Sequence, residues 1–372
     1  MHLMAPDAFI LFAAGSCDAA DQPDAGEAED PLYEIIDNHL VDIVSNSWAY
    51  AGEEDAAPGV VISDTFKFLQ AAAQGMTVLF ASGDEGDSTY YGRNIASGSW
   101  PATNPLVTAV GGTSLLLKNA SGEKSEFGWT NFYSLFDNAL ISNNGETVTD
   151  HGWEPFAFDD GSGGGPSLLM PEPIYQYNVV PKEFSTQTYT SSGVPVPLAP
   201  PRRVTPDISM VADPFTGMLF GETYTISSPP VDAGCLQLTE MTEYCEQAIG
   251  GTSLATPLLA GVLGLVNQSR FFERLGPVGF VNPALYRLLV GENAESGTPL
   301  VDVNAPSKPT SGLYAELGFD DFVLLGTIDS DVDGNGNIIA NVDTSLHSAP
   351  GYDDVTGLGV PNVPEFIEAL RY

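Results

Sequence analysis

Mostly apolar segments recur along the first third of the chain, and four of them are predicted to be strands. Residues 8–13 are continuously apolar, as is typical of a strand buried on both faces, and the others lie at residues 41–44, 77–81 and 106–110. Two segments between them have helix signals: Asp30 and Pro31 begin a helix over residues 30–39, and Gly75 ends one over residues 63–74. This alternation predicts an α/β fold with a doubly wound, mostly parallel sheet and helices on both faces.

The middle of the chain follows a looser pattern. Residues 113–201 contain many aromatic residues and a glycine-rich stretch at 161–166. We expect peripheral strands and long loops there. Because no repeat and no clear linker divides the sequence, we predict one domain over residues 1–372.

The most distinctive stretch is Gly250-Gly251-Thr252-Ser253, which leads through Pro257 into an apolar run at residues 258–266. A serine at the start of a helix lies among unpaired N–H groups at the positive end of the helix dipole. Negative charge that develops on an attacked carbonyl would be stabilised there. Ser253 is therefore a candidate nucleophile, and the alternative is that it only caps the helix.

A second candidate, Asp84, follows the strand predicted at residues 77–81. Ligand sites in parallel sheets form just beyond the carboxyl ends of the strands. At such a position Asp84 could be a buried acid that stays protonated and donates a hydrogen bond. It could equally be a turn residue, since Asp and Gly are common turn formers.

Composition narrows the function classes. The 372 residues, 43% of them hydrophobic, are enough for a large globular core. Forty-nine acidic and 12 basic residues give a net charge of −37, which argues against nucleic acid and anionic membranes as partners. Self-repulsion at this charge eases in acid or in high salt. Arg202 and Arg203 either position carboxylates or relieve local repulsion, and we favour the second role.

The three cysteines allow one disulfide bond but do not establish it. Cys235 and Cys245 are close enough in sequence to close one loop, whereas Cys17 has no evident partner. Residues 1–7 lack the basic start of a signal peptide, and no apolar run is long enough to span a bilayer.

Acidic turns near the C-terminus point to Ca²⁺, which prefers oxygen ligands. Asp302-Val303-Asn304 and residues 351–359 could bring carboxylates and backbone carbonyls together. Residues 331–337 match the first positions of an EF-hand loop, but Val342 stands where that loop needs Glu. Residues 331–337 could therefore be either a second Ca²⁺ site or an ordinary acidic surface turn.

Several of these stretches occur together and in order. They are Ser45-Asn46-Ser47-Trp48, residues 81–84, residues 100–113, Pro206-Asp207-Ile208-Ser209, Gly250-Gly251-Thr252-Ser253 and residues 351–359. This set resembles the sedolisin family of serine-carboxyl peptidases and covers nearly the whole chain. The resemblance implies a subtilisin-like fold and a secreted, extracellular serine-type endopeptidase that cleaves peptide bonds at acidic pH.

The resemblance also implies roles for particular residues. Ser253 corresponds to the nucleophile and Asp84 to the acid that stabilises the oxyanion. Substrate would be bound by Ser45, Asn46, Ser47, Trp48, Gly111 and Gly112. Ca²⁺ would be held in a region over residues 300–359, by the side chains of Asp302 and Asp353 and the carbonyls of Val303, Ala349 and Gly351. We expect a monomer that acts on proteins or peptides.

One departure bears on activity. The family's general base is the Glu of a Glu-x-x-x-Asp pair, which precedes a stretch like residues 3–8, so the chain is expected to begin after both positions. The spacings Glu146 to Asp150 and Glu316 to Asp320 fall elsewhere, and no histidine stands in a subtilisin-like setting. Because a positioned base contributes about 10²–10⁴-fold to the rate, we expect this chain to have weak activity or none. The alternative function is a catalytically inactive, calcium-stabilised peptide-binding or scaffold protein. The sequence does not decide between endopeptidase and tripeptidyl-peptidase action.

Overall fold

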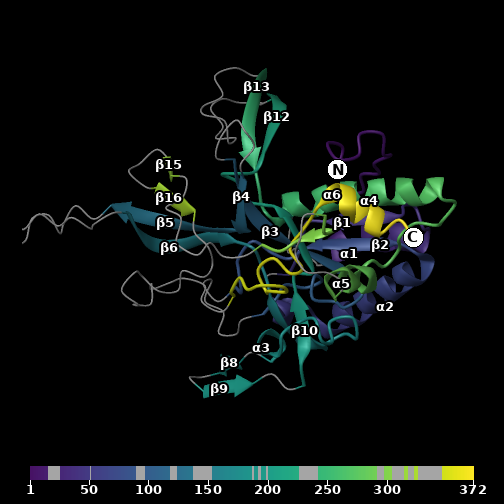
Figure 1. Cartoon of the computed structure of the whole chain (residues 1–372), viewed down its shortest axis with the longest axis horizontal. Helices are drawn as coiled ribbons and strands as arrows, with labels where there is room; N and C mark the ends of the chain where they lie inside the picture. The colour runs from purple at the N-terminus through teal and green to yellow at the C-terminus, as the bar shows by residue number, and fades with distance from the viewer. Residues whose placement is uncertain are drawn as a thin grey trace, which may run out of the picture.

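A parallel sheet forms the centre of the fold (Figure 1). In this computed structural model its strands run in the order β1 (Ile43–Asn46), β2 (Thr77–Ala81), β3 (Thr108–Leu117) and β11 (Ile208–Val211), all parallel, and β4 (Lys124–Gly128) pairs antiparallel with β3. The described residues are 1–15, 26–50, 52–88, 97–117, 124–136, 153–186, 188–191, 194–197, 200–225, 242–290, 297–303, 314–316, 322–325 and 346–372.

Helices cover both faces of this sheet, as the sequence predicts. Along β2, Leu79 faces the core cluster that contains α4 (Thr252–Phe272), α5 (Asn282–Val290) and α6 (Val363–Ala369). Its neighbours Val78 and Phe80 face the other cluster, with α1 (Gly26–Asp37) and α2 (Pro58–Gln74). Because successive strand residues point to opposite faces, a strand between two helical layers is apolar throughout. The doubly wound α/β fold is confirmed.

Some element boundaries differ from the predictions. Helix α2 begins at Pro58, because proline suits the first helical position, and ends at Gly75 with φ +80° as expected. Helix α1 begins before Asp30, which therefore does not cap it. Strand β3 continues to Leu117, because its second half pairs with β4 after the pairing with β11 ends.

Residues 8–13 are not a strand in the structure, contrary to the prediction. They have neither helical nor strand structure, and Phe9 and Phe12 are 88% and 87% exposed. The preceding turn packs on α4, where Met1 and Met4 border Gly261. The apolar pattern measures how well a segment suits burial, but a strand also needs an edge to pair with.

Smaller sheets surround the centre, in agreement with the peripheral strands predicted for residues 113–201. Their strands pair antiparallel. They comprise β5 (Thr130–Phe136) with β6 (Trp153–Gly161), β15 (Tyr314–Glu316) and β16 (Phe322–Leu325); β7 (Gly165–Pro171) with β10 (Arg202–Thr205); β8 (Thr188–Ser191) with β9 (Val194–Pro197); β12 (Met218–Thr225) with β13 (Thr242–Ile249); and β14 (Leu300–Val301) with β17 (Val360–Pro361). Two short helices, η1 (Glu53–Asp55) and α3 (Lys182–Ser185), complete the elements in the described residues.

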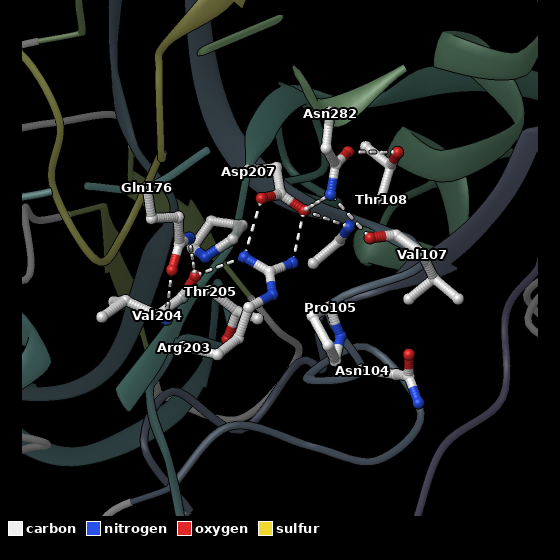
Figure 2. Close-up of polar contacts among 12 residues, drawn as sticks. Asn104, Pro105, Val107, Thr108, Gln176, Arg203, Val204, Thr205, Asp207 and Asn282 are labelled. Carbon is white, nitrogen blue, oxygen red and sulfur yellow. Dashed lines mark hydrogen bonds and ion pairs between the residues drawn. The ribbon is translucent and has the colours of Figure 1, made fainter. Parts of the chain in front are cut away.

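Arg203 does not relieve surface repulsion, which corrects the role favoured from the sequence. Its side chain is wholly buried, and its two terminal nitrogens donate to the two carboxylate oxygens of Asp207 at 2.7 and 2.6 Å (Figure 2). Asp207 also accepts from the Ala109 N–H at 2.8 Å and the Tyr286 hydroxyl at 2.7 Å. A buried charge requires such partners, so this pair fixes the start of β11 against β3 and α5.

Candidate active site

The stretch around Ser253 lies where β11 ends and α4 begins. Gly251 precedes the helix with φ +85°, a conformation that favours glycine, and its N–H bonds to the carbonyl of Ala212 just beyond β11. The N-cap is Gly251, which offers no side-chain cap. Ser253 is the second helical residue and is exposed, so it is not the cap of this helix.

Asp84 lies against the residue that precedes Ser253. Its Oδ1 is 2.7 Å from both the backbone nitrogen and the hydroxyl of Thr252. The same hydroxyl is 3.0 Å from the carbonyl of Gly83. These contacts join the carboxyl end of β2 to the positive end of the α4 dipole. Asp84 is therefore directed at the start of α4, which a simple turn residue would not require.

A glycine-rich stretch that was expected in a peripheral loop holds the backbone of Gly83 and Asp84. The N–H of Gly161 donates to the carbonyl of Asp84 at 2.8 Å, and the N–H of Gly163 donates to the carbonyl of Gly83 at 2.8 Å. A Cβ on Gly163 would lie 2.4 Å from the Ser82 carbonyl oxygen. Glycine stands at four of the five positions 161–165, and close approach of two backbones leaves no room for side chains. This composition was the sequence signal that the stretch packs against another backbone segment.

Among the residues expected to bind substrate at the end of β1, Ser47 contacts Ser253. The Ser47 hydroxyl donates to the Ser253 carbonyl at 3.1 Å, and the Asn46 side chain donates to the Leu79 carbonyl at 3.0 Å. The Trp48 ring packs edge-on against Phe80 at 5.2 Å between centroids. Ser45 lies within β1, and the contacts of Asn46 and Trp48 join this stretch to β2.

Gly111 and Gly112 lie within β3 and are buried. A Cβ on Gly111 would lie 2.6 Å from Pro206 Cγ, and one on Gly112 would lie 2.5 Å from Ala212 Cβ. The Gly112 N–H donates to the Ser162 hydroxyl at 2.9 Å. Both glycines are in the protein interior. Because they have no side chains, β3 can lie close to β11.

The five residues expected to hold Ca²⁺ include two carboxylates bound to the same loop. The Gly351 N–H donates to Asp302 Oδ2 at 2.8 Å, and the Ala349 N–H donates to Asp353 Oδ2 at 3.2 Å. Asp353 is wholly buried, which raises the pKa of its carboxyl to about 7 although the Thr356 N–H and others donate to it. Val303 is buried beside Asp302.

This donor set suits a hard cation in composition, since it offers two carboxylates and backbone carbonyls. The described residues contain no group of three or more His, Cys, Asp or Glu side chains that could hold a metal ion. A Ca²⁺ site here would therefore depend on carbonyl oxygens for most of its ligands.

Two predictions fall outside the described residues. The EF-hand-like stretch 331–337 lies there, as do Cys17 and Cys235, so the proposed disulfide stays a prediction. Cys245 lies in β13, in register with Glu222 of β12. Among the described helices, none has the length and hydropathy that crossing a membrane requires.

Ser253 is thus exposed at the start of α4 and follows Thr252, which contacts Asp84 at the end of β2. A family model described as "Subtilase family" (Peptidase_S8) matches residues 2–282. The chain belongs to the subtilase family of serine-type peptidases.

Individual relatives agree with the predicted sedolisin resemblance. The chain is 27% identical over 361 residues to tripeptidyl-peptidase 1 of Mus musculus and 29% identical over 332 residues to that of Homo sapiens. These matches cover 94% and 87% of this chain but 47% and 42% of the relatives, so the chain spans somewhat less than half of their length.

A solved structure confirms the fold. Pseudomonas sedolisin, a serine-carboxyl proteinase complexed with two molecules of pseudo-iodotyrostatin, is similar with a TM-score of 0.56 and 23% identity. The similarity covers 95% of this chain and 71% of that chain.

Proposed function

We propose that this chain is the catalytic part of a serine-type peptidase that hydrolyses peptide bonds at acidic pH. The observation that carries the proposal is the double contact of Thr252 with Asp84, which brings a carboxyl group to the start of α4 beside Ser253. A nucleophile and a group that stabilises developing negative charge are the two requirements of acyl transfer that this geometry supports.

Each side chain has a defined task in this proposal. The Ser253 oxygen attacks the scissile carbonyl carbon, and its proton passes through solvent to the amine, which leaves as the C–N bond breaks. Water then hydrolyses the acyl-serine ester, which releases the acid product and restores the Ser253 hydroxyl. Asp84, in its acid form, donates a hydrogen bond to the oxyanion, and the dipole of α4 stabilises the same charge. We assign no proton acceptor, since among the described residues no carboxylate or histidine is bonded to the Ser253 hydroxyl.

Acidic conditions suit the charge of the protein surface. A net charge of −37 weakens as carboxylates take up protons, so the self-repulsion of the folded chain falls. An extracellular, acidic setting and a monomeric state complete the proposal, with neither nucleic acid nor membrane as partner.

Ca²⁺ would stabilise the C-terminal loops. Asp302 and Asp353 would contribute carboxylates, and Val303, Ala349 and Gly351 would contribute carbonyl oxygens. The ion would supply positive charge to a buried carboxylate and take no part in the hydrolysis. The loop is close to the sheet, because the Leu358 N–H donates to the Asp207 carbonyl at 2.9 Å.

The substrate is an extended stretch of protein or peptide. Two curated relatives are named tripeptidyl-peptidase 1, and one structural neighbour is called a proteinase. Endopeptidase action and release of tripeptides from an amino end give different products, so the products decide between them.

The test is incubation of the protein with a denatured protein substrate at acidic pH, followed by mass spectrometry of the products. Internal cleavage supports an endopeptidase, and serial loss of three residues supports a tripeptidyl-peptidase. Intact substrate that nevertheless binds would contradict the proposal and favour the inactive, calcium-stabilised peptide-binding or scaffold protein. Binding is measured with a fluorescently labelled form of the same substrate.

A further inference from the structure

Asp213 is a wholly buried carboxylate that has no opposite charge beside it. It follows the end of β11, and its exposed fraction is 0%. Among the described residues, no lysine, arginine or histidine forms an ion pair with Asp213, whereas the equally buried Asp207 is paired with Arg203. Burial raises the pKa of the Asp213 carboxyl, because a charge removed from water is costly. A positively charged partner would offset this cost.

Polar groups surround this carboxylate, and two of the oxygen atoms lack a partner. Asp213 Oδ1 accepts from the Phe215 N–H at 2.9 Å and from the Asn131 side-chain nitrogen at 3.3 Å. Asp213 Oδ2 and Asn131 Oδ1 are both buried, and neither has a hydrogen-bond partner in the described part of the chain. The Ser114 and Thr216 hydroxyls also lie beside the carboxyl and favour its ionised form. Because buried polar atoms nearly always have partners, the two oxygens indicate a ligand between them.

The chemistry of these atoms favours a hard, singly charged cation. The available ligands are one carboxylate, one amide oxygen and two hydroxyls, and hard cations prefer such oxygens. One carboxylate balances the charge of a monovalent ion, whereas a divalent ion would leave one positive charge unbalanced. A bridging water would also bond to the two oxygens, but the buried negative charge would then stay uncompensated.

Three parts of the fold meet at this carboxylate. Ser114 lies in β3, Asn131 lies in β5, and Asp213 lies just beyond β11. The carbonyl of Ala212, the residue before Asp213, accepts from the N–H of Gly251, which is the N-cap of α4. An ion at this point would therefore fix the strand end that holds the start of α4.

We propose that Asp213, Asn131 and Ser114 bind a monovalent alkali cation, Na⁺ or K⁺, between β3, β5 and the end of β11. The Asp213 carboxylate balances the charge of the ion, and the two neutral oxygens replace part of its hydration shell. This site is separate from the C-terminal loop that contains Asp302 and Asp353. The proposal is independent of whether the chain hydrolyses peptides.

Thermal unfolding of the unmodified protein tests the proposal. The Tm is compared in NaCl, KCl and choline chloride at equal ionic strength, with excess chelator throughout to remove divalent ions. Choline screens surface charges but is too large for a buried site. Because an ion that binds only the native state stabilises it, Na⁺ or K⁺ should raise the Tm by about 2–4 °C above the value in choline. Equal Tm values in the three salts would overturn the proposal and indicate a proton or a buried water instead.

A matched pair of variants locates the effect. Asp213→Asn keeps the shape of the side chain but removes its charge, so its Tm should be the same in all three salts. Asp302→Asn makes the same change at the expected Ca²⁺ site and should keep the full response to Na⁺ or K⁺. A response that persists in Asp213→Asn, or that is lost in Asp302→Asn, would overturn the proposal, because the ion would then bind elsewhere.

Ser114→Ala is a milder variant that serves if Asp213→Asn does not fold. It removes one neutral ligand and keeps the carboxylate, so the half-maximal rise in Tm should need a several-fold higher concentration of Na⁺ or K⁺. An unchanged half-maximal concentration would overturn the proposed set of ligands.

Discussion

The backbone N–H and the hydroxyl of Thr252 both lie 2.7 Å from Oδ1 of Asp84. Thr252 thereby ties the carboxyl group that follows β2 to the helix that carries Ser253. Because Thr252 contacts Asp84 and precedes the proposed nucleophile, it is a positioning residue for both groups.

Replacing the Thr252 hydroxyl tests that role. Thr252→Val keeps the shape and the backbone N–H but removes one hydrogen bond to Asp84, so we expect kcat to fall about ten-fold with little change in KM. Thr252→Ser retains a hydroxyl and should recover most of the rate. An equal loss of activity in both variants would contradict the positioning role of the Thr252 hydroxyl.

A second prediction concerns the close contact between β3 and β11. In Gly112→Ala the new Cβ would lie 2.5 Å from Ala212 Cβ and 2.8 Å from Trp129 Cε3. Since both neighbours belong to the core, we expect a loss of about 1–3 kcal/mol in the free energy of unfolding, measured by denaturant titration. Gly59→Ala is the control, because nothing lies within 4 Å of its Cβ position. Similar stabilities for the two variants would refute the packing argument.

A third prediction concerns pH. Burial raises the pKa of the Asp64 carboxyl, although the Tyr33 hydroxyl at 2.6 Å and the Trp100 indole N–H at 2.7 Å donate to it. A pKa raised on folding gives stability that is fully present below the unfolded value of about 4 and is lost as pH rises through the folded value. The stability that Asp64 contributes should therefore fall as the pH rises from about 4 through the raised pKa of the folded state.

The variant Asp64→Asn should flatten that fall, because its side chain has no proton to lose. Thermal unfolding at a series of pH values measures the effect. Asp37→Asn serves as the comparison, because hydrogen bonding to Lys67 lowers the pKa of the Asp37 carboxyl, so its contribution has the opposite sign. A slope unchanged by Asp64→Asn would show that this carboxyl does not titrate differently on folding.

A fourth prediction concerns Ca²⁺. An ion that binds only the native state stabilises it, so excess chelator should lower the Tm of the unmodified protein, and added Ca²⁺ should restore it. In Asp302→Asn the response to Ca²⁺ should be weaker, whereas the exposed Asp30→Asn should respond as the unmodified protein does. Identical melting curves with and without chelator would rule out the site.

The sequence predicted the central fold because the strands of a parallel sheet carry their own signal. Residues 77–81, four of them apolar, are all buried and form β2 with those bounds. The stop at Gly75 was also predictable, since its φ of +80° favours glycine. The strand expected at residues 8–13 was not found, because pairing depends on where the rest of the chain lies.

The sequence indicated the two candidate residues of the site, Ser253 and Asp84, but not the contact that connects them. Ser253 and Asp84 stand in recognisable local settings, a helix start and a strand end. The contact of Thr252 with Asp84 joins residues 168 positions apart, which no local pattern specifies. The same limit explains Arg203: its partner Asp207 is four residues away, but burial of the pair follows from tertiary packing.

The central claim is that Ser253 is the nucleophile. The measurement is the rate of cleavage of a denatured protein substrate at acidic pH by the unmodified chain, by Ser253→Ala and by Ser269→Ala, a serine in the last turns of the same helix. We predict that Ser253→Ala loses at least about 10³-fold in rate and that Ser269→Ala keeps the unmodified rate. Cleavage by Ser253→Ala at the unmodified rate would contradict the account.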